Sequence, residues 1–155
     1  MFWTRLGRGL AAGAAGVTAL NAITYLDMAV RARPASGTPS QAVERLAGKA
    51  GARIPGEGAE RDNRLAGLGP LAGIMTGAAV GVTAAFARPV LARVPAPVGV
   101  ALLGALAMAG ADGPLVALGL TKPGGWTPAD WASDVIPHLG YGAATYATVM
   151  ALSAD

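Results

Sequence analysis

The stretch from Leu65 to Ala87 contains no charged side chain and has glycine at every fourth position. Roughly 20 apolar residues in a helix cross the ~30 Å hydrocarbon core of a bilayer, so this stretch predicts a transmembrane helix. Glycines four residues apart share one side of a helix, where a neighbouring backbone can come close. We expect tight packing through four glycines: Gly69, Gly73, Gly77 and Gly81.

The composition of the chain is that of a small membrane domain. Of its 155 residues, 53% are hydrophobic and 14% are charged, which is less charge than a soluble domain normally carries. The basic residues lie between apolar runs, as in loops that meet lipid headgroups, and nothing indicates nucleic-acid binding. Abundant Arg, Ala and Gly are typical of a GC-rich bacterial genome. We therefore expect a multi-pass protein of a bacterial cell membrane.

Three further apolar runs predict helices over residues 9–30, 98–118 and 135–153. Together with 65–87 they predict an all-α integral membrane bundle of four transmembrane helices in one domain, 1–155. The first run carries Gly9 and Gly13 at the same close-packing spacing. A signal peptide would also begin this way, but the apolar run continues past the expected cleavage point, which favours a helix that is retained.

The long polar loop over residues 31–64 contains one amphipathic helix. Thr38 as the N-cap, Pro39 at the first helical position and Gln41 at the third predict a capping box. The helix would lie on the membrane surface or against the bundle. The alternative is a solvated connector.

The sequence Asp112-Gly-Pro interrupts the third apolar run and leaves two structures open. In one, which the strong turn signal favours, the helix ends there and Asp112 is an interfacial turn residue. In the other, the helix continues towards Leu120 with a break, and Asp112 lies at membrane depth, where a charge is expensive and marks a functional site.

The last predicted helix carries the one polar constellation of the chain. Thr127, Pro128 and Asp130 predict a capping box at its start, and Trp126 and Trp131 are expected at the membrane boundary. Spacings of four, three, four and three residues place five polar side chains on one face: Asp134, His138, Tyr141, Thr145 and Thr148.

This polar face has two interpretations. It is either a proton or small-solute pathway, or a pH-responsive element, in which Asp134 and Tyr141 assist His138 and to which Asp112 and Asn21 contribute. Alternatively, it is packing: His138 and Asn21 find partners on neighbouring helices, and the threonines bond their own backbone.

Catalytic and metal-binding motifs are absent from the sequence. The chain has one histidine and no cysteine, which excludes disulfides, thiolate catalysis and histidine-rich or Cys-based metal sites. The glycines lack the strand and the lysine of a phosphate-binding loop. We therefore predict that the protein is not an enzyme and has no cofactor or metal.

The most direct functional expectation is a structural or accessory membrane protein that packs with itself, as a homo-oligomer, or with a larger membrane complex. Counting Lys and Arg in the loops places the long loop in the cytoplasm, whereas Arg5 and Arg8 beside the first helix favour the opposite orientation.

Three short stretches resemble small uncharacterised membrane proteins of GC-rich bacteria: residues 20–27, 33–36 and 134–142. Within the last of these, His-Leu-x-Tyr-Gly is similar to the YagU-like inner-membrane family, which is linked to survival in acid. The resemblance implies a multi-pass inner-membrane protein and a pH-related role for His138 and Tyr141.

Overall fold

The structure is a computed structural model that describes residues 2–152, and helices are its only regular elements within that range. Their bounds are α1 Phe2–Arg31, α2 Thr38–Lys49, α3 Gly58–Phe86, α4 Arg88–Leu91, α5 Ala96–Ala117, the 3₁₀ turn η1 Pro123–Gly125, and α6 Pro128–Ala151. The predicted all-α class is confirmed.

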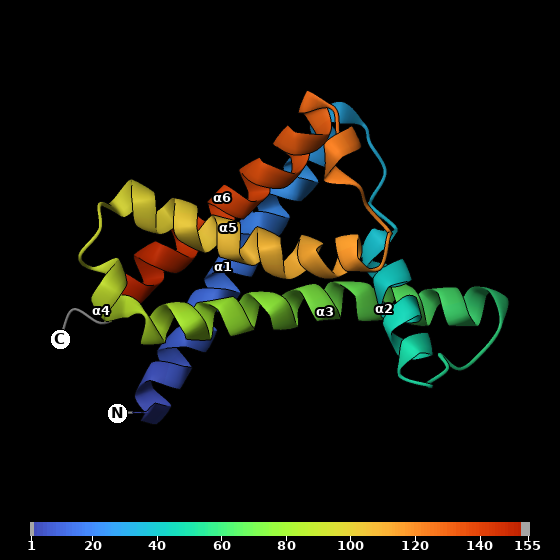
Figure 1. Cartoon of the computed structure of the whole chain (residues 1–155), viewed down its shortest axis with the longest axis horizontal. Coiled ribbons are helices and arrows are strands. Elements are labelled where there is room, and N and C mark those ends of the chain that lie inside the picture. Colours follow the sequence, from blue (N-terminus) through green and yellow to red (C-terminus); the bar gives the residue numbers. More distant parts are fainter. Residues whose placement is uncertain (1, 153–155) are drawn as a thin grey trace.

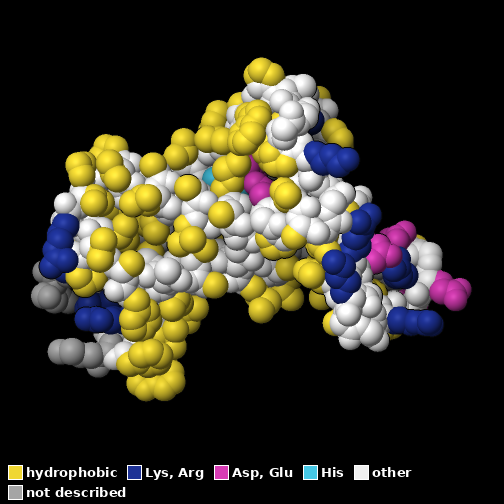
Figure 2. All heavy atoms as spheres, viewed as in Figure 1, with side chains coloured by type: hydrophobic (Ala, Val, Ile, Leu, Met, Phe, Trp, Pro, Cys, Tyr) yellow, Lys and Arg dark blue, Asp and Glu magenta, His cyan; other side chains and the backbone are white. Residues whose placement is uncertain are grey.

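Three of these helices, α1, α3 and α5, are long and apolar enough to cross a membrane. This supports the prediction of a membrane protein. The basic side chains gather toward two opposite ends of the molecule, with hydrophobic side chains spread between them (Figure 2). That distribution is the one expected of a bundle whose middle lies in lipid.

The four long helices form two crossed layers (Figure 1). Helices α3 and α5 lie beside each other in one layer, and α1 and α6 cross them in the other. Helix α1 packs on both α3 and α6, and α6 also packs on α5. Two clusters of buried side chains fill the centre. One includes Ala12, Ala84 and Val149, and the other is built around Val80 and Tyr141.

The crossing of α1 over α3 depends on glycines from both helices. A Cβ atom on Gly81 would lie 2.5 Å from the Cα atom of Gly13, and a Cβ on Gly13 would lie 2.7 Å from the carbonyl oxygen of Gly77. A Cβ on Gly9 would meet the backbone of Val82 at 2.5 Å. The two backbones are therefore in direct contact, as small residues at spacing four allow.

The other two glycines of the α3 stripe do not take part in this crossing. Gly69 faces α2, where an added Cβ would lie 2.9 Å from the backbone nitrogen of Ser40. Gly73 is exposed, and a Cβ built there meets no atom within 4 Å. The glycine stripe expected from the sequence is thus shared between two partner helices, α1 and α2, with one open position at Gly73. The reason is that α1 crosses α3 at an angle, so it contacts only part of the stripe.

Helix α2 lies against the first half of α3. The sequence left open whether this helix would lie on the membrane surface or against the bundle, and it contacts the bundle. The Ser40 hydroxyl donates to the carbonyl of Leu65 at 3.0 Å, and Arg61 forms an ion pair with Glu44. Arg45 of α2 donates to the carbonyl of Leu118 at 2.6 Å, which satisfies an orphan carbonyl at the C-terminal end of α5.

The capping box predicted at Thr38 is wrong. Helix α2 begins with Thr38 itself, Gly37 precedes it as the N-cap, and the Thr38 amide donates to the Ser36 hydroxyl at 3.2 Å. The hydroxyl oxygen of Thr38 instead accepts a hydrogen bond from Ser36 at 2.9 Å.

The turn favoured at Asp112-Gly-Pro is also wrong, because α5 continues through it to Ala117. Proline removes one backbone donor from the helix, but the following turn is closed by the Leu118 amide donating to the Pro114 carbonyl at 2.9 Å. Away from water a helix keeps its internal hydrogen bonds, so the turn propensity of three residues is not enough to end it. Asp112 therefore projects from a continuous helix.

Replacing Gly81 with Ala should destabilise the bundle, because the new methyl group would collide with the backbone of α1. We expect a loss of about 1–3 kcal/mol in the free energy of unfolding, the usual cost of overpacking. The matched control is Gly73→Ala in the same helix, which should be neutral or stabilising because alanine is the better helix former. Unfolding in mixed micelles titrated with dodecyl sulfate measures both. Equal losses would contradict the packing described.

Candidate functional site

Helix α6 starts at the capping box that the sequence predicts. The Asp130 amide donates to the Thr127 hydroxyl at 3.2 Å, and the Thr127 amide donates to the Asp130 carboxylate at 2.9 Å. Hydrogen bonds from the Thr127 hydroxyl and backbone lower the pKa of the exposed Asp130 carboxyl. The rings of Trp126 and Trp131 pack edge to face, with centroids 4.9 Å apart. These contacts fix where the polar face of α6 begins.

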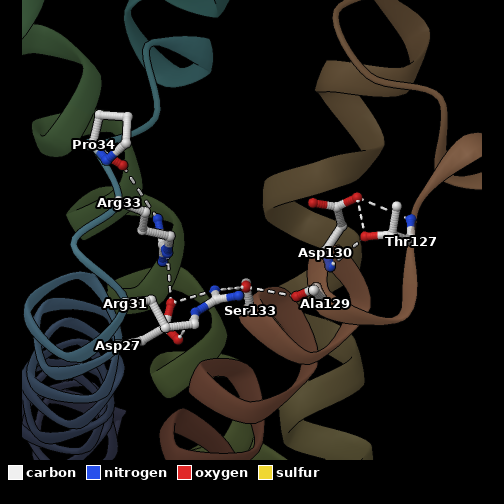
Figure 3. A network of polar contacts seen from close by, with 8 residues as sticks. All are labelled: Asp27, Arg31, Arg33, Pro34, Thr127, Ala129, Asp130 and Ser133. Carbon is white, nitrogen blue, oxygen red and sulfur yellow. Dashed lines mark hydrogen bonds and ion pairs between the residues drawn. The ribbon is translucent and has the colours of Figure 1, made fainter.

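A charged network joins the C-terminal end of α1 to the first turns of α6 (Figure 3). The Asp27 carboxylate accepts hydrogen bonds from Arg31 at 2.6 Å and from Arg33 at 2.5 Å. Arg31 also donates to the hydroxyl of Ser133 on α6. This network holds α6 in register with α1 immediately before Asp134.

The polar face of α6 points into the bundle. Tyr141 and Thr145 are 1% and 0% exposed, and His138 is 8% exposed. Asp134 and Thr148 are half-buried at the two ends of the row. The three central side chains therefore meet other helices rather than lipid.

The half of this face that follows His138 consists of satisfied packing contacts. The Tyr141 hydroxyl donates to the carbonyl of Gly77 on α3 at 2.6 Å, and Thr145 donates to the carbonyl of Ala12 on α1 at 3.3 Å. Thr148 bonds the carbonyl of Ala144 in its own helix at 2.8 Å. These bonds are those of interhelical packing and of threonine back-bonding.

The other half of the face differs, because its carboxyl groups are not fully satisfied. The Nδ1 atom of His138 lies 2.8 Å from the carbonyl oxygen of Asp134 and 3.4 Å from its carboxylate. Asp112 of α5 is half-buried, eight residues after Gly104 and on the side of α5 that packs on α6. One oxygen of each carboxyl, Oδ2 of Asp112 and Oδ2 of Asp134, is buried with no partner among the described residues.

A close crossing of α5 and α6 brings these residues together. A Cβ atom on Gly104 would lie 2.8 Å from the carbonyl oxygen of His138, and one on Gly142 would lie 2.8 Å from the amide nitrogen of Gly104. The helices run in opposite directions at this point. Asp112 follows Gly104 by the same number of residues as Asp134 precedes Gly142, so the antiparallel register sets the two carboxyls opposite each other.

We name Asp112, Asp134 and His138 the acid–imidazole cluster. Histidine and acidic atoms reach the surface close together, among hydrophobic side chains, on the face seen in Figure 2. The Asp134 side chain is 22% exposed and that of His138 is 10% exposed. The cluster is thus mostly buried but accessible, as a site that exchanges protons must be.

The remaining predicted polar residue, Asn21, is half-buried on α1. Within residues 2–152 no group of three or more His, Cys, Asp or Glu side chains is arranged to hold a metal ion. The acid–imidazole cluster offers one imidazole and two buried carboxylate oxygens that have no partner among the described residues.

Sequence analysis missed several glycines that shape the site. Gly16 of α1 lies under the Tyr141 ring, where a Cβ atom would approach to 2.6 Å, and Gly140 faces Ile23. Gly16 lies seven residues after Gly9, so it continues the same side of α1. That spacing could have revealed it.

Comparisons of the chain with protein-family models, with curated proteins and with solved structures gave no match.

Replacing Tyr141 with Phe removes the hydrogen bond that joins α6 to Gly77 of α3 while keeping the ring. We expect a loss of about 1 kcal/mol in the free energy of unfolding, the typical net value of one such bond. Tyr25→Phe is the matched control, since Tyr25 is 60% exposed on α1. Denaturant titration in detergent measures the free energy of unfolding of both variants. If Tyr141→Phe unfolds with the same free energy as the parent, this hydrogen bond contributes nothing to stability.

Proposed function

We propose that the protein is a pH-responsive multi-pass protein of the bacterial cell membrane, in which the acid–imidazole cluster binds and releases protons. The observation that carries this proposal is the pair of buried, unpartnered carboxylate oxygens on Asp112 and Asp134, beside His138. Ionisable groups inside an apolar bundle are costly to keep, which favours a functional role for them. The pH-related role implied by the His-Leu-x-Tyr-Gly resemblance points the same way.

The proposal includes α6 as a fourth membrane span and α2 as a surface helix in the first loop. Helix α6 packs along both α1 and α5, and its polar side chains turn inward. Its outward side chains include Ile136 and Leu139, which are 55% and 42% exposed and suit contact with lipid. A span with its polar groups inside the bundle is the expected arrangement for a polar transmembrane helix.

The chemistry of the cluster follows from its charges. Two carboxylates that share an apolar site repel each other, so one of them gains by holding a proton. A neutral imidazole has one donor and one acceptor nitrogen and becomes a double donor when protonated. Asp134 and His138 are the charged groups that act on Asp112, and the two aspartates are those that act on His138. Protonation therefore changes the charge and the hydrogen bonding of the α5–α6 contact.

The rest of the polar face favours proton binding over proton conduction. A pathway through the bundle would continue from His138 to Tyr141 and Thr145. Those hydroxyls are bonded to the backbones of α3 and α1 instead. The cluster is better suited to respond to the acidity of one compartment.

The test uses the absence of cysteine from the chain, which allows spin labels at introduced cysteines without background labelling. Val116 of α5 and Ile136 of α6 are 46% and 55% exposed and accept labels. We expect the distance between the labels in liposomes to change between about pH 5 and pH 8, and Asp112→Asn to abolish the change because it removes one of the paired charges.

Thr148→Val is the matched control, because Thr148 lies on the same face of α6 but bonds only its own helix. This variant should keep the pH response of the parent. A label distance that does not depend on pH, or a response that survives Asp112→Asn, would overturn the proposed function.

A second candidate function, that of a structural or accessory subunit, is favoured by the open position on α3. Gly73 is exposed between the exposed side chains of Leu71, Ile74 and Met75, so this face has room for the backbone of another helix. A second copy of the chain would make a homo-oligomer there. A larger membrane complex could use the same face.

Gly73→Leu tests this second candidate, because it adds bulk at a position where a Cβ atom meets nothing in the bundle within 4 Å. If copies associate through α3, the variant should be monomeric in detergent under conditions where the parent is a dimer, by native mass spectrometry. Ala72→Leu, one position away, is the control for added bulk. A parent that is already monomeric at all detergent-to-protein ratios would exclude this role for Gly73.

A further inference from the structure

One end of the bundle gathers α2, the C-terminal ends of α1 and α5 and the first turns of α6, and we name it the α2 end. Arg45 of α2 donates to the carbonyl of Leu118, just after α5, at 2.6 Å. Arg31 of α1 donates to the hydroxyl of Ser133 on α6. The opposite end holds α4, and we name it the α4 end.

The acid–imidazole cluster lies close to the α2 end. Asp112 precedes Leu118 by six residues, and Asp134 directly follows Ser133. Six helical residues rise about 9 Å, so Asp112 lies less than two turns from the point where Arg45 contacts α5. Both carboxyls are therefore near the polar groups of this end.

The route from the cluster to the α4 end is closed by packing. After His138, the side chains of Tyr141, Thr145 and Val149 are 1%, 0% and 0% exposed. The hydroxyls of Tyr141 and Thr145 are bonded to backbone carbonyls of α3 and α1. Val149 belongs to a buried apolar cluster that includes Leu91 of α4. Close-packed apolar surroundings of this kind hold no chain of water.

The charged groups around the cluster follow the same division. Apart from the cluster itself, those on the helices that meet at the α2 end include Asp27, Arg31 and Arg33 of α1, Arg45 of α2 and Asp130 of α6 (Figure 3). Helix α5 contributes only Asp112, and α3 has no charged side chain between residues 65 and 87. The nearest titratable group towards the α4 end is the bonded Tyr141 hydroxyl. Hydrated charges therefore approach the cluster from the α2 end.

We propose that the acid–imidazole cluster exchanges its protons with the compartment at the α2 end, and not with the compartment at the α4 end. Asp134, whose side chain is 22% exposed, is the group through which protons enter, and His138, at 10%, lies one turn deeper. Ionisable groups inside a membrane protein exchange protons where water reaches them. This inference rests on the proposed function and adds the compartment whose acidity controls it.

The side of access is measured with introduced cysteines, because the parent chain has none. Each variant in sealed liposomes is treated from outside with a charged, membrane-impermeant thiol reagent. Arg53→Cys, on the exposed connection from α2 to α3, reports the fraction of molecules whose α2 end faces outward. Val90→Cys, at a position 61% exposed on α4, reports the complementary fraction.

We expect Asp134→Cys to react to the same extent as the Arg53→Cys reference, and Asp112→Cys repeats the measurement on α5. The matched control is Thr145→Cys, on the same face of α6 but 0% exposed, which should not react because a buried thiol is inert. Reaction of the two aspartate positions to the extent of Val90→Cys, or no reaction at either, would overturn the inference.

A one-sided pH change separates this inference from the proposed function. Spin labels at Val116 and Ile136 report the α5–α6 distance in liposomes of known orientation, while one side is shifted between about pH 8 and pH 5, the range in which histidine titrates. We expect the distance to change only when the α2 side is acidified. A change driven from the α4 side would overturn this inference alone. No change from either side would overturn the proposed function, and this inference with it.

Discussion

Direct contact between helix backbones is the constraint on which the rest of this structure depends. Among the long helices of the described range it occurs at two antiparallel crossings, where Gly9 and Gly13 meet Gly77 and Gly81, and where Gly104 meets Gly142. Helices in lipid gain little from burying apolar side chains, so close packing and interhelical hydrogen bonds must hold them together. A larger side chain at either crossing would separate the helices, and the close packing and the interhelical hydrogen bonds would then be lost.

The close crossings also determine the chemistry of the interior. Because α1 and α3 approach so closely, Tyr141 and Thr145 of α6 can reach their backbone carbonyls and close one part of the polar face. Because α5 and α6 cross at Gly104 and Gly142, Asp112 and Asp134 are held opposite each other with buried oxygens unsatisfied. One polar face thus contains packing contacts at one end and a protonatable cluster at the other.

Sequence periodicity predicted the long helices, the single polar face of α6 and the capping box at Thr127, because these follow from local spacing, but not that this face points inward. It favoured the wrong outcome at Asp112-Gly-Pro, where the turn propensity of three residues is weaker than the hydrogen bonding of a helix that packs on its neighbours. It could not separate Gly73 from Gly77, because the angle at which α1 leaves α3 is a property of both helices. The sequence could not place Asp112 opposite Asp134, because that register follows from the crossing of α5 and α6 at Gly104 and Gly142.

In the proposed function, His138 shares its protons with the two aspartates of the acid–imidazole cluster. Because the chain has one histidine, ¹⁵N labelling of histidine gives the ring signals of His138 alone. The most direct measurement is the titration of these signals in liposomes, for the parent and for Asp112→Asn. We predict that the midpoint of the His138 titration moves in the variant. Identical titration curves would show that Asp112 and His138 do not act together and would contradict this account.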